Sequence, residues 1–265
     1  ILEATMLISV LMALTTILHR IWLQKFQFSL HWLSLAIGAG LGGAWLLAWG
    51  TPQLSEWFDY AGYEAVNATL QFCTIGLLLA FSIALDPQKF ALHSRVRCVI
   101  AVVCMISMVA FGIIREGSEI MLYMSGNMAQ PEFITPVLLG TLMATGIGIS
   151  CGVLLYIGLI NMAHQWTFRA GMLLLALYAG NMAAQAVQLL NQADWLPYTP
   201  QLWDSSMFIA EGGITGHLLH ALIGYESNPS ALQAGAYFVA MVLVLCSPLF
   251  RHAWWAPGSV LVQNK

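Results

Sequence analysis

The stretch CVIAVVCMISMVAFGIIREGSEIMLY, residues 98–123, is a long apolar run that carries three charged side chains near its end. A helix that crosses the hydrocarbon core of a bilayer needs roughly 20 apolar residues, so this run is long enough to cross. Charged groups inside such a helix are costly and mark functional sites by default. The three charges are Arg115, Glu116 and Glu119. The stretch therefore predicts a spanning helix that carries a polar site.

The whole chain has the same apolar character. Of its 265 residues, 59% are hydrophobic and 8% are charged, the formal net charge is −3, and the mean hydropathy is +0.77. An average soluble domain is about 25% charged, so this chain has too few polar groups to cover a surface that faces water. A soluble enzyme is therefore excluded, and the lack of a basic patch argues against nucleic-acid binding. We predict an all-α polytopic membrane protein in which residues 1–265 form a single transmembrane domain.

Seven apolar runs predict about seven transmembrane helices. They cover residues 1–19, 33–49, 64–84, 98–123, 135–160, 170–190 and 231–249. The stretch 206–223 is also apolar, but its glycines and histidines favour a surface or re-entrant helix over a full span. Glycine-rich second and fifth runs favour a 3+3 inverted repeat followed by a seventh helix.

The distribution of charge predicts the orientation in the membrane. Eight of the nine Lys and Arg residues lie in alternate loops or in the C-terminal tail, and the positive-inside rule makes that side cytoplasmic. The N-terminus then lies outside and the C-terminus lies in the cytoplasm. The opposite loops have acids and no bases, which attracts cations, although the same acids equally serve to solvate the loops. These acids are Glu56, Asp59, Glu132, Asp194, Asp204, Glu211 and Glu226.

The ionisable residues of the predicted spans are candidates for a metal site. Glu116 and Glu119 are three residues apart and share one helix face, where they offer the oxygen ligands that hard cations prefer. Arg115 lies four residues before Glu119 and could orient it, while Gly117 lets another helix approach closely. The alternative is a buried Arg–Glu pair that only locks helix packing.

Acids on two further spans extend this candidate site. Glu3 lies near the outer end of the first span, at the depth expected for Arg115–Glu119. Glu64 begins the third span from outside and either adds a ligand or serves only as a helix N-terminal acid. His217 and His220 share a helix face, which is compatible with an external metal-loading point or with interfacial histidines.

The sequence lacks the common signatures of catalysis and of bound cofactors. There is no C-x-x-C, H-E-x-x-H or P-loop motif, and no histidines are placed within a span for bis-histidine haem ligation. We expect a protein that is not an enzyme and that holds no permanently bound cofactor.

The motif R-E-G-S-E at 115–119 resembles the R-E-x-x-E motif of the oxidase-dependent iron permease family, which occurs in the first and fourth spans. In that family the first copy is followed by alanine, so Glu3 and Ala4 match its end and residue 1 is expected to lie inside the motif. Tyr63-Glu64 resembles the family's acidic start of span three. Other matching segments are the glycine run of span five, the Ala-Gly span six, 202–206, 216–225 and 228–230.

The resemblance implies a single permease domain in a bacterial inner (cytoplasmic) membrane. A periplasmic oxidase or cupredoxin-type partner would oxidise ferrous iron, and the permease would move the ferric ion inward through its carboxylates. The implied ligands are Glu3, Glu116 and Glu119, with Arg115 balancing their charge, and Glu64 is added as a candidate. Two alternatives stay open. One is a permease for another divalent cation such as manganese or lead, and the other is a non-transporting electron-transfer subunit.

Overall fold

The computed structural model describes the chain except for residues 22–30, 85–93, 129–130, 211 and 248–265. The described residues fold into helices and contain no strand, although an isolated β-bridge pairs Gln201 with Ser230. The prediction of an all-α protein is therefore confirmed. The helices are α1 (Leu2–Ile21), α2 (His31–Ser55), α3 (Gly62–Ala84), α5 (Ser94–Met128), α6 (Pro131–Asn161), α7 (His164–Gln192), α8 (Ile214–Ile223) and α9 (Ala231–Leu245).

Each apolar run of the sequence coincides with one of these helices. Five of them, α2, α3, α5, α6 and α7, are long and apolar enough to cross a bilayer. The apolar parts of α1 (Leu2–Ile17) and α9 are shorter. The seven-span count, the orientation and the inverted repeat therefore stay predictions. The orientation also depends on Lys25, Lys89, Arg251 and Lys265, which lie outside the described residues.

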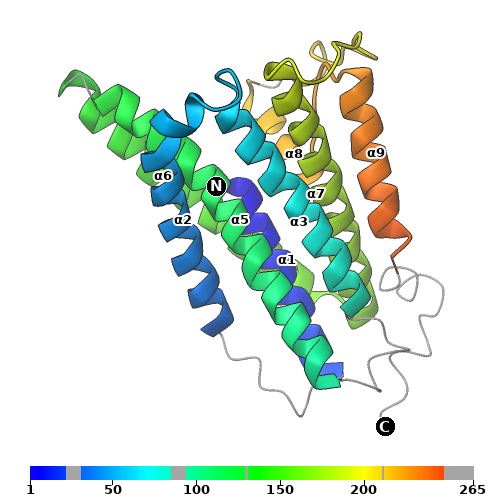
Figure 1. Cartoon of the computed structure of the whole chain (residues 1–265). Coiled ribbons are helices and arrows are strands. Elements are labelled where there is room, and N and C mark those ends of the chain that lie inside the picture. The colour runs from blue at the N-terminus through cyan, green and yellow to red at the C-terminus, as the bar shows by residue number, and fades with distance from the viewer. Residues whose placement is uncertain (22–30, 85–93, 129–130, 211, 248–265) are drawn as a thin grey trace.

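The apolar stretch 206–223 yields only the short helix α8. Its ten residues rise about 15 Å at 1.5 Å per residue, which is half of the roughly 30 Å hydrocarbon core. This agrees with the expectation that the stretch does not cross the membrane. Helix α8 lies at the end of the bundle where α3 and α9 begin and α7 ends (Figure 1).

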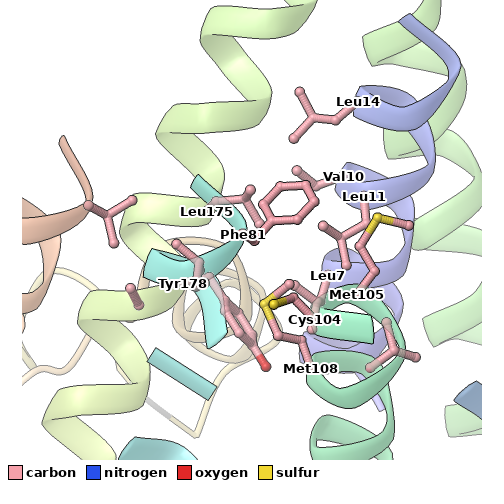
Figure 2. Packing of buried hydrophobic residues seen from close by; sticks show 14 of the residues in the cluster. Leu7, Val10, Leu11, Leu14, Phe81, Cys104, Met105, Met108, Leu175 and Tyr178 are labelled. Atoms are coloured by element: carbon pink, nitrogen blue, oxygen red, sulfur yellow. The ribbon is translucent and has the colours of Figure 1, made fainter. Parts of the chain in front are cut away.

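Helix α1 is the central element of the bundle. Its residues Leu7, Leu11 and Leu14 follow the spacing of one helix face and are fully buried. Figure 2 shows them facing side chains of α3, α5 and α7, among them Phe81 and Leu175. A helix that is packed on several sides holds its first turn firmly in place, and that turn carries Glu3.

Helix α2 packs along α5 through small residues. A Cβ atom added to Gly117 would lie 2.9 Å from the Cβ of Ala44 in α2. Gly117 therefore permits the close helix approach that the sequence predicts, and the neighbouring helix is α2.

Replacing Gly117 with leucine is expected to lower the stability of the folded protein by about 1–3 kcal/mol, because the added side chain must push α2 away from α5. Thermal unfolding in detergent measures the change. Gly126→Leu on the same helix is the matched control, since a Cβ there meets nothing within 4 Å. Equal unfolding temperatures for the two variants would contradict this packing.

Candidate metal-translocation site

A buried ion pair between Glu3 of α1 and Arg115 of α5 lies at the centre of the site. The two residues expose only 8% and 7% of their surfaces. The guanidinium Nη2 pairs with Glu3 Oε2, and Nη1 donates to Gln185 Oε1 on α7. One arginine thus connects three helices. Its hydrogen-bonded carboxylate partner is Glu3, and it also interacts electrostatically with Glu119, for which the spacing of 115 and 119 suggests an orienting role.

The neutral side chain of Gln185 is the hub of this polar cluster. Its Nε2 donates to Glu3 Oε1 at 2.8 Å and to Asn181 Oδ1 at 3.0 Å. Its Oε1 accepts from Gln71 Nε2 of α3 at 3.2 Å in addition to Arg115. Asn181 also donates to Glu3 Oε1, at 3.2 Å. Amides of α3 and α7 therefore fix the geometry of the ion pair.

The pattern of ionisable and metal-ligating side chains in the sequence does not point to these amides. A signal was present, since polar amides recur at 181, 185, 188 and 192 within an apolar helix, a spacing that places them on one face. A buried polar group needs hydrogen-bond partners, so such a stripe predicts a polar neighbour.

The two histidines of α8 are used differently. His220 lies with Nε2 3.6 Å from Glu3 Oε1 and 3.2 Å from Gln185 Nε2. Its Nδ1 lies 3.0 Å from the Tyr225 carbonyl, so the ring is held with Nε2 facing the cluster. His217 is exposed, and its Nδ1 lies 2.9 Å from the Gly213 carbonyl. Only His220 therefore belongs to the site.

Glu116 and Glu119 lie on α5 in different surroundings. Glu116 is buried, and its Oε1 accepts from the Ala4 backbone N–H at 3.0 Å, so it contacts the first turn of α1. Its Oε2 lies against the Ile1 nitrogen. Glu119 is exposed, yet it is near enough to Arg115 and Glu116 to interact with both electrostatically. Of the two acids of the motif, Glu116 is therefore buried and Glu119 is exposed.

Glu64 lies at the start of α3, next to Tyr63, whose side chain is beside Ser118 of α5. This places the beginning of α3 against the part of α5 that carries Glu119. Across the described residues, no three His, Cys, Asp or Glu side chains lie close enough to hold one metal ion. The four predicted ligands therefore do not form a single chelating cluster in this structure.

Among the acids outside the helices, Asp204 has a defined local geometry. Its Oδ1 accepts from the Ser206 backbone N–H at 2.9 Å and from the Ser206 hydroxyl at 2.6 Å. These hydrogen bonds stabilise the charged form and hold the pKa of Asp204 below its usual value. The carboxylate is therefore ionised at neutral pH. Glu211, another of these acids, lies outside the described residues.

An all-helical bundle with long apolar helices and a buried carboxylate–guanidinium cluster is typical of a multi-pass membrane transporter. The chain belongs to the iron permease FTR1 family, whose sequence profile matches residues 2–259. This confirms the resemblance drawn from R-E-G-S-E, and the family is one of permeases.

Several curated proteins are similar to the chain. The ferrous iron permease EfeU of Shigella flexneri is 25% identical over 142 residues, which cover 53% of this chain and 60% of the relative. EfeU of Escherichia coli O6:H1 is likewise 25% identical over 142 residues, or 53% of this chain and 51% of the relative. The match thus spans only half to three fifths of the length of these relatives. No solved structure matches the chain.

Replacing Arg115 with lysine is expected to lower the transport rate about tenfold, because an ammonium lacks the fork that reaches Glu3 and Gln185 together. Uptake of radioactive iron into vesicles measures the rate. Arg97→Lys is the matched control, since Arg97 Nη1 only donates to the Ile83 carbonyl at an exposed position. Wild-type rates for Arg115→Lys would show that bidentate geometry is irrelevant.

Proposed function

We propose that the protein is an iron uptake permease of a bacterial cytoplasmic membrane, with residues 1–265 acting as one permease domain. Membership of the iron permease family supports the substrate class. The observation that carries the proposal is the meeting of α1 and α5, where Arg115 pairs with Glu3 and Glu116 accepts from Ala4. Two helices distant in the sequence thus share one buried acidic site.

The carboxylates of Glu3, Glu116 and Glu119 are the proposed iron ligands, and Glu64 is the proposed entry ligand. Four carboxylates against the single guanidinium of Arg115 give the site a formal charge of 1 − 4 = −3. Such a site attracts a multivalent cation, and oxygen donors suit hard iron ions. Since no three acids among the described residues chelate one ion, passage requires the carboxylates to move together as Arg115 leaves Glu3.

Ferric iron, supplied by a periplasmic oxidase or cupredoxin-type partner, is the proposed transported species. All-oxygen coordination favours the harder ferric ion over softer metals. The relatives are named ferrous iron permeases, so the ferrous ion is the alternative transported species. Acids outside the helices, including Asp204, would concentrate cations at the entrance.

Uptake of radioactive iron by vesicles that contain the purified protein tests this function. We expect uptake above that of empty vesicles, an increase when a ferroxidase is added, and little competition from manganese or lead. Glu119→Ala is expected to reduce uptake at least tenfold while the protein still inserts, because it removes the exposed carboxylate that receives the ion. Ser125→Ala, at an exposed position of the same helix α5, is the control.

Three results would contradict the proposal. Uptake equal to that of empty vesicles excludes iron transport. Stronger competition by manganese or lead than by unlabelled iron identifies another cation. Uptake that is faster under reducing conditions than with the ferroxidase identifies ferrous iron as the transported species.

A further inference from the structure

One face of α3 carries a row of buried oxygen atoms without hydrogen-bond donors. Within the described part of the chain, no donor reaches Glu64 Oε2, Asn67 Oδ1 or Gln71 Oε1. Asn67 and Gln71 are exposed by only 1% and 2% of their surfaces. Positions 64, 67 and 71 follow the i, i+3, i+7 spacing of one helix face. Unpaired buried acceptors are costly to a fold, so a row of three needs a reason.

The amide nitrogens in this row contact protein groups, while the amide oxygens do not. Asn67 Nδ2 donates to the Tyr63 carbonyl at 3.0 Å, and Gln71 Nε2 donates to Gln185 Oε1 at 3.2 Å. Each nitrogen thus has a protein acceptor, whereas Asn67 Oδ1 and Gln71 Oε1 have no donor among the described residues. The Tyr63 side chain lies beside Asn67, but it leaves Oδ1 unpaired. Buried oxygen acceptors without a protein donor suit a cation and disfavour an anion.

The row connects two parts of the acidic site. At one end Glu64 and Tyr63 begin α3 beside the segment of α5 that carries Glu119. At the other end Gln71 contacts Gln185, which holds both Glu3 and Arg115. The span from 64 to 71 is about 10 Å along the helix axis. The next polar residue on this face, Thr74, donates its hydroxyl to the Leu70 carbonyl, so it interrupts the row after Gln71; Ser82 Oγ, also unpaired in the described part of the chain, lies about three turns deeper, away from the acidic site.

We propose that Asn67 Oδ1 and Gln71 Oε1 form a second cation-binding station, which takes a partly dehydrated iron ion between Glu64 and Glu3. This inference rests on the proposed function and adds two neutral ligands to its path. Neutral amide oxygens replace water around the ion without holding it as tightly as carboxylates, and weak intermediate sites keep an ion moving.

Asn67 gives the sharpest test because its amide nitrogen bonds only to the backbone of its own helix, so its replacement leaves the Gln185 hub intact. Asn67→Leu keeps a similar volume and removes the oxygen. We expect uptake of radioactive iron at low concentration, and equilibrium binding of that iron to the purified protein, to fall about tenfold. Asn67→Asp keeps an oxygen at the site and is expected to retain both properties. Thr74→Val, about two turns deeper on the same face, is the matched control.

The outcomes separate this inference from the function on which it rests. No uptake by the wild-type protein overturns iron transport itself. If the wild type takes up iron, and folded Asn67→Leu takes up and binds iron within twofold of the wild type, the row of oxygens has only a structural role and the proposed station is wrong. If Asn67→Leu fails to fold, Asn67→Ala decides, because it removes the same oxygen with a smaller side chain and leaves Gln185 untouched: a tenfold loss of iron binding supports the station, and unchanged binding overturns it.

Discussion

Replacing Glu3 with glutamine is expected to destabilise the folded protein by about 3–5 kcal/mol and to abolish iron uptake. The substitution leaves the guanidinium of Arg115 buried without a carboxylate, and breaking a buried ion pair from one side carries a cost of this size. It also removes the anion that Asn181 and Gln185 hold in place. Thermal unfolding in detergent and uptake into vesicles measure the two effects.

A double variant separates the structural effect from the transport effect. Glu3→Gln combined with Arg115→Gln removes both charges, so most of the lost stability should return. Uptake should stay lost, because the proposed ligand and its charge partner are both absent. Wild-type stability of the single Glu3→Gln variant would contradict the buried ion pair. Wild-type uptake by the double variant would show that the pair only stabilises the packing of α1 on α5.

Replacing Gln185 with leucine is expected to reduce uptake at least tenfold and to cost about 2–4 kcal/mol of stability. The change removes the acceptor of Arg115 and Gln71 and the donor to Glu3 and Asn181. Each buried group left without a partner costs about 1–3 kcal/mol, and part of that cost is relieved by local repacking. Uptake and thermal unfolding are again the measurements.

Gln192→Leu is the matched control for this prediction, because Gln192 lies on the same helix at an exposed position. We expect it to keep wild-type uptake. Similar losses of uptake in the Gln185 and Gln192 variants would mean that polar residues anywhere on α7 are required. Gln185 would then have no special role.

The sequence predicted much of the fold because apolar length is a strong signal. Every apolar run became a helix, and 206–223 became the short α8 instead of a span. The thickness of the hydrocarbon core sets the length that a spanning helix needs. A run of apolar residues of that length can be recognised directly in the sequence. The number of helices that cross the membrane is harder to predict, because the apolar parts of α1 and α9 are short. Local composition does not show whether neighbouring helices hold such a short helix in the membrane.

The site was predicted in part. Spacing on α5 correctly placed Glu116 and Glu119 near one another, but only tertiary packing decides that Glu116 faces α1 while Glu119 stays exposed. The meeting of Glu3 with Arg115 depends on the rotation of two helices about their axes, which spacing within one helix cannot give. Spacing within α5 relates Arg115 to Glu119, and only the packing of α1 on α5 reveals its ion pair with Glu3.

The histidines show how a loop decides a role that spacing leaves open. His217 and His220 share a face, yet only His220 reaches the cluster. Helix α8 ends at Gly224 with a φ of 67°, a left-handed conformation that glycine adopts at no steric cost. The chain then turns so that the Tyr225 carbonyl lies beside His220 Nδ1. This turn orients Nε2 toward Glu3.

The most direct test of iron passage through the buried carboxylates compares wild-type protein with Glu116→Gln in sealed vesicles. Initial uptake of radioactive iron is followed with a ferroxidase present, after both proteins are shown to unfold at similar temperatures. Glutamine keeps the shape of the side chain and an oxygen that accepts from Ala4. The proposed mechanism predicts a loss of uptake of at least tenfold. Equal uptake by the two proteins would contradict it and leave the carboxylate with a structural role alone.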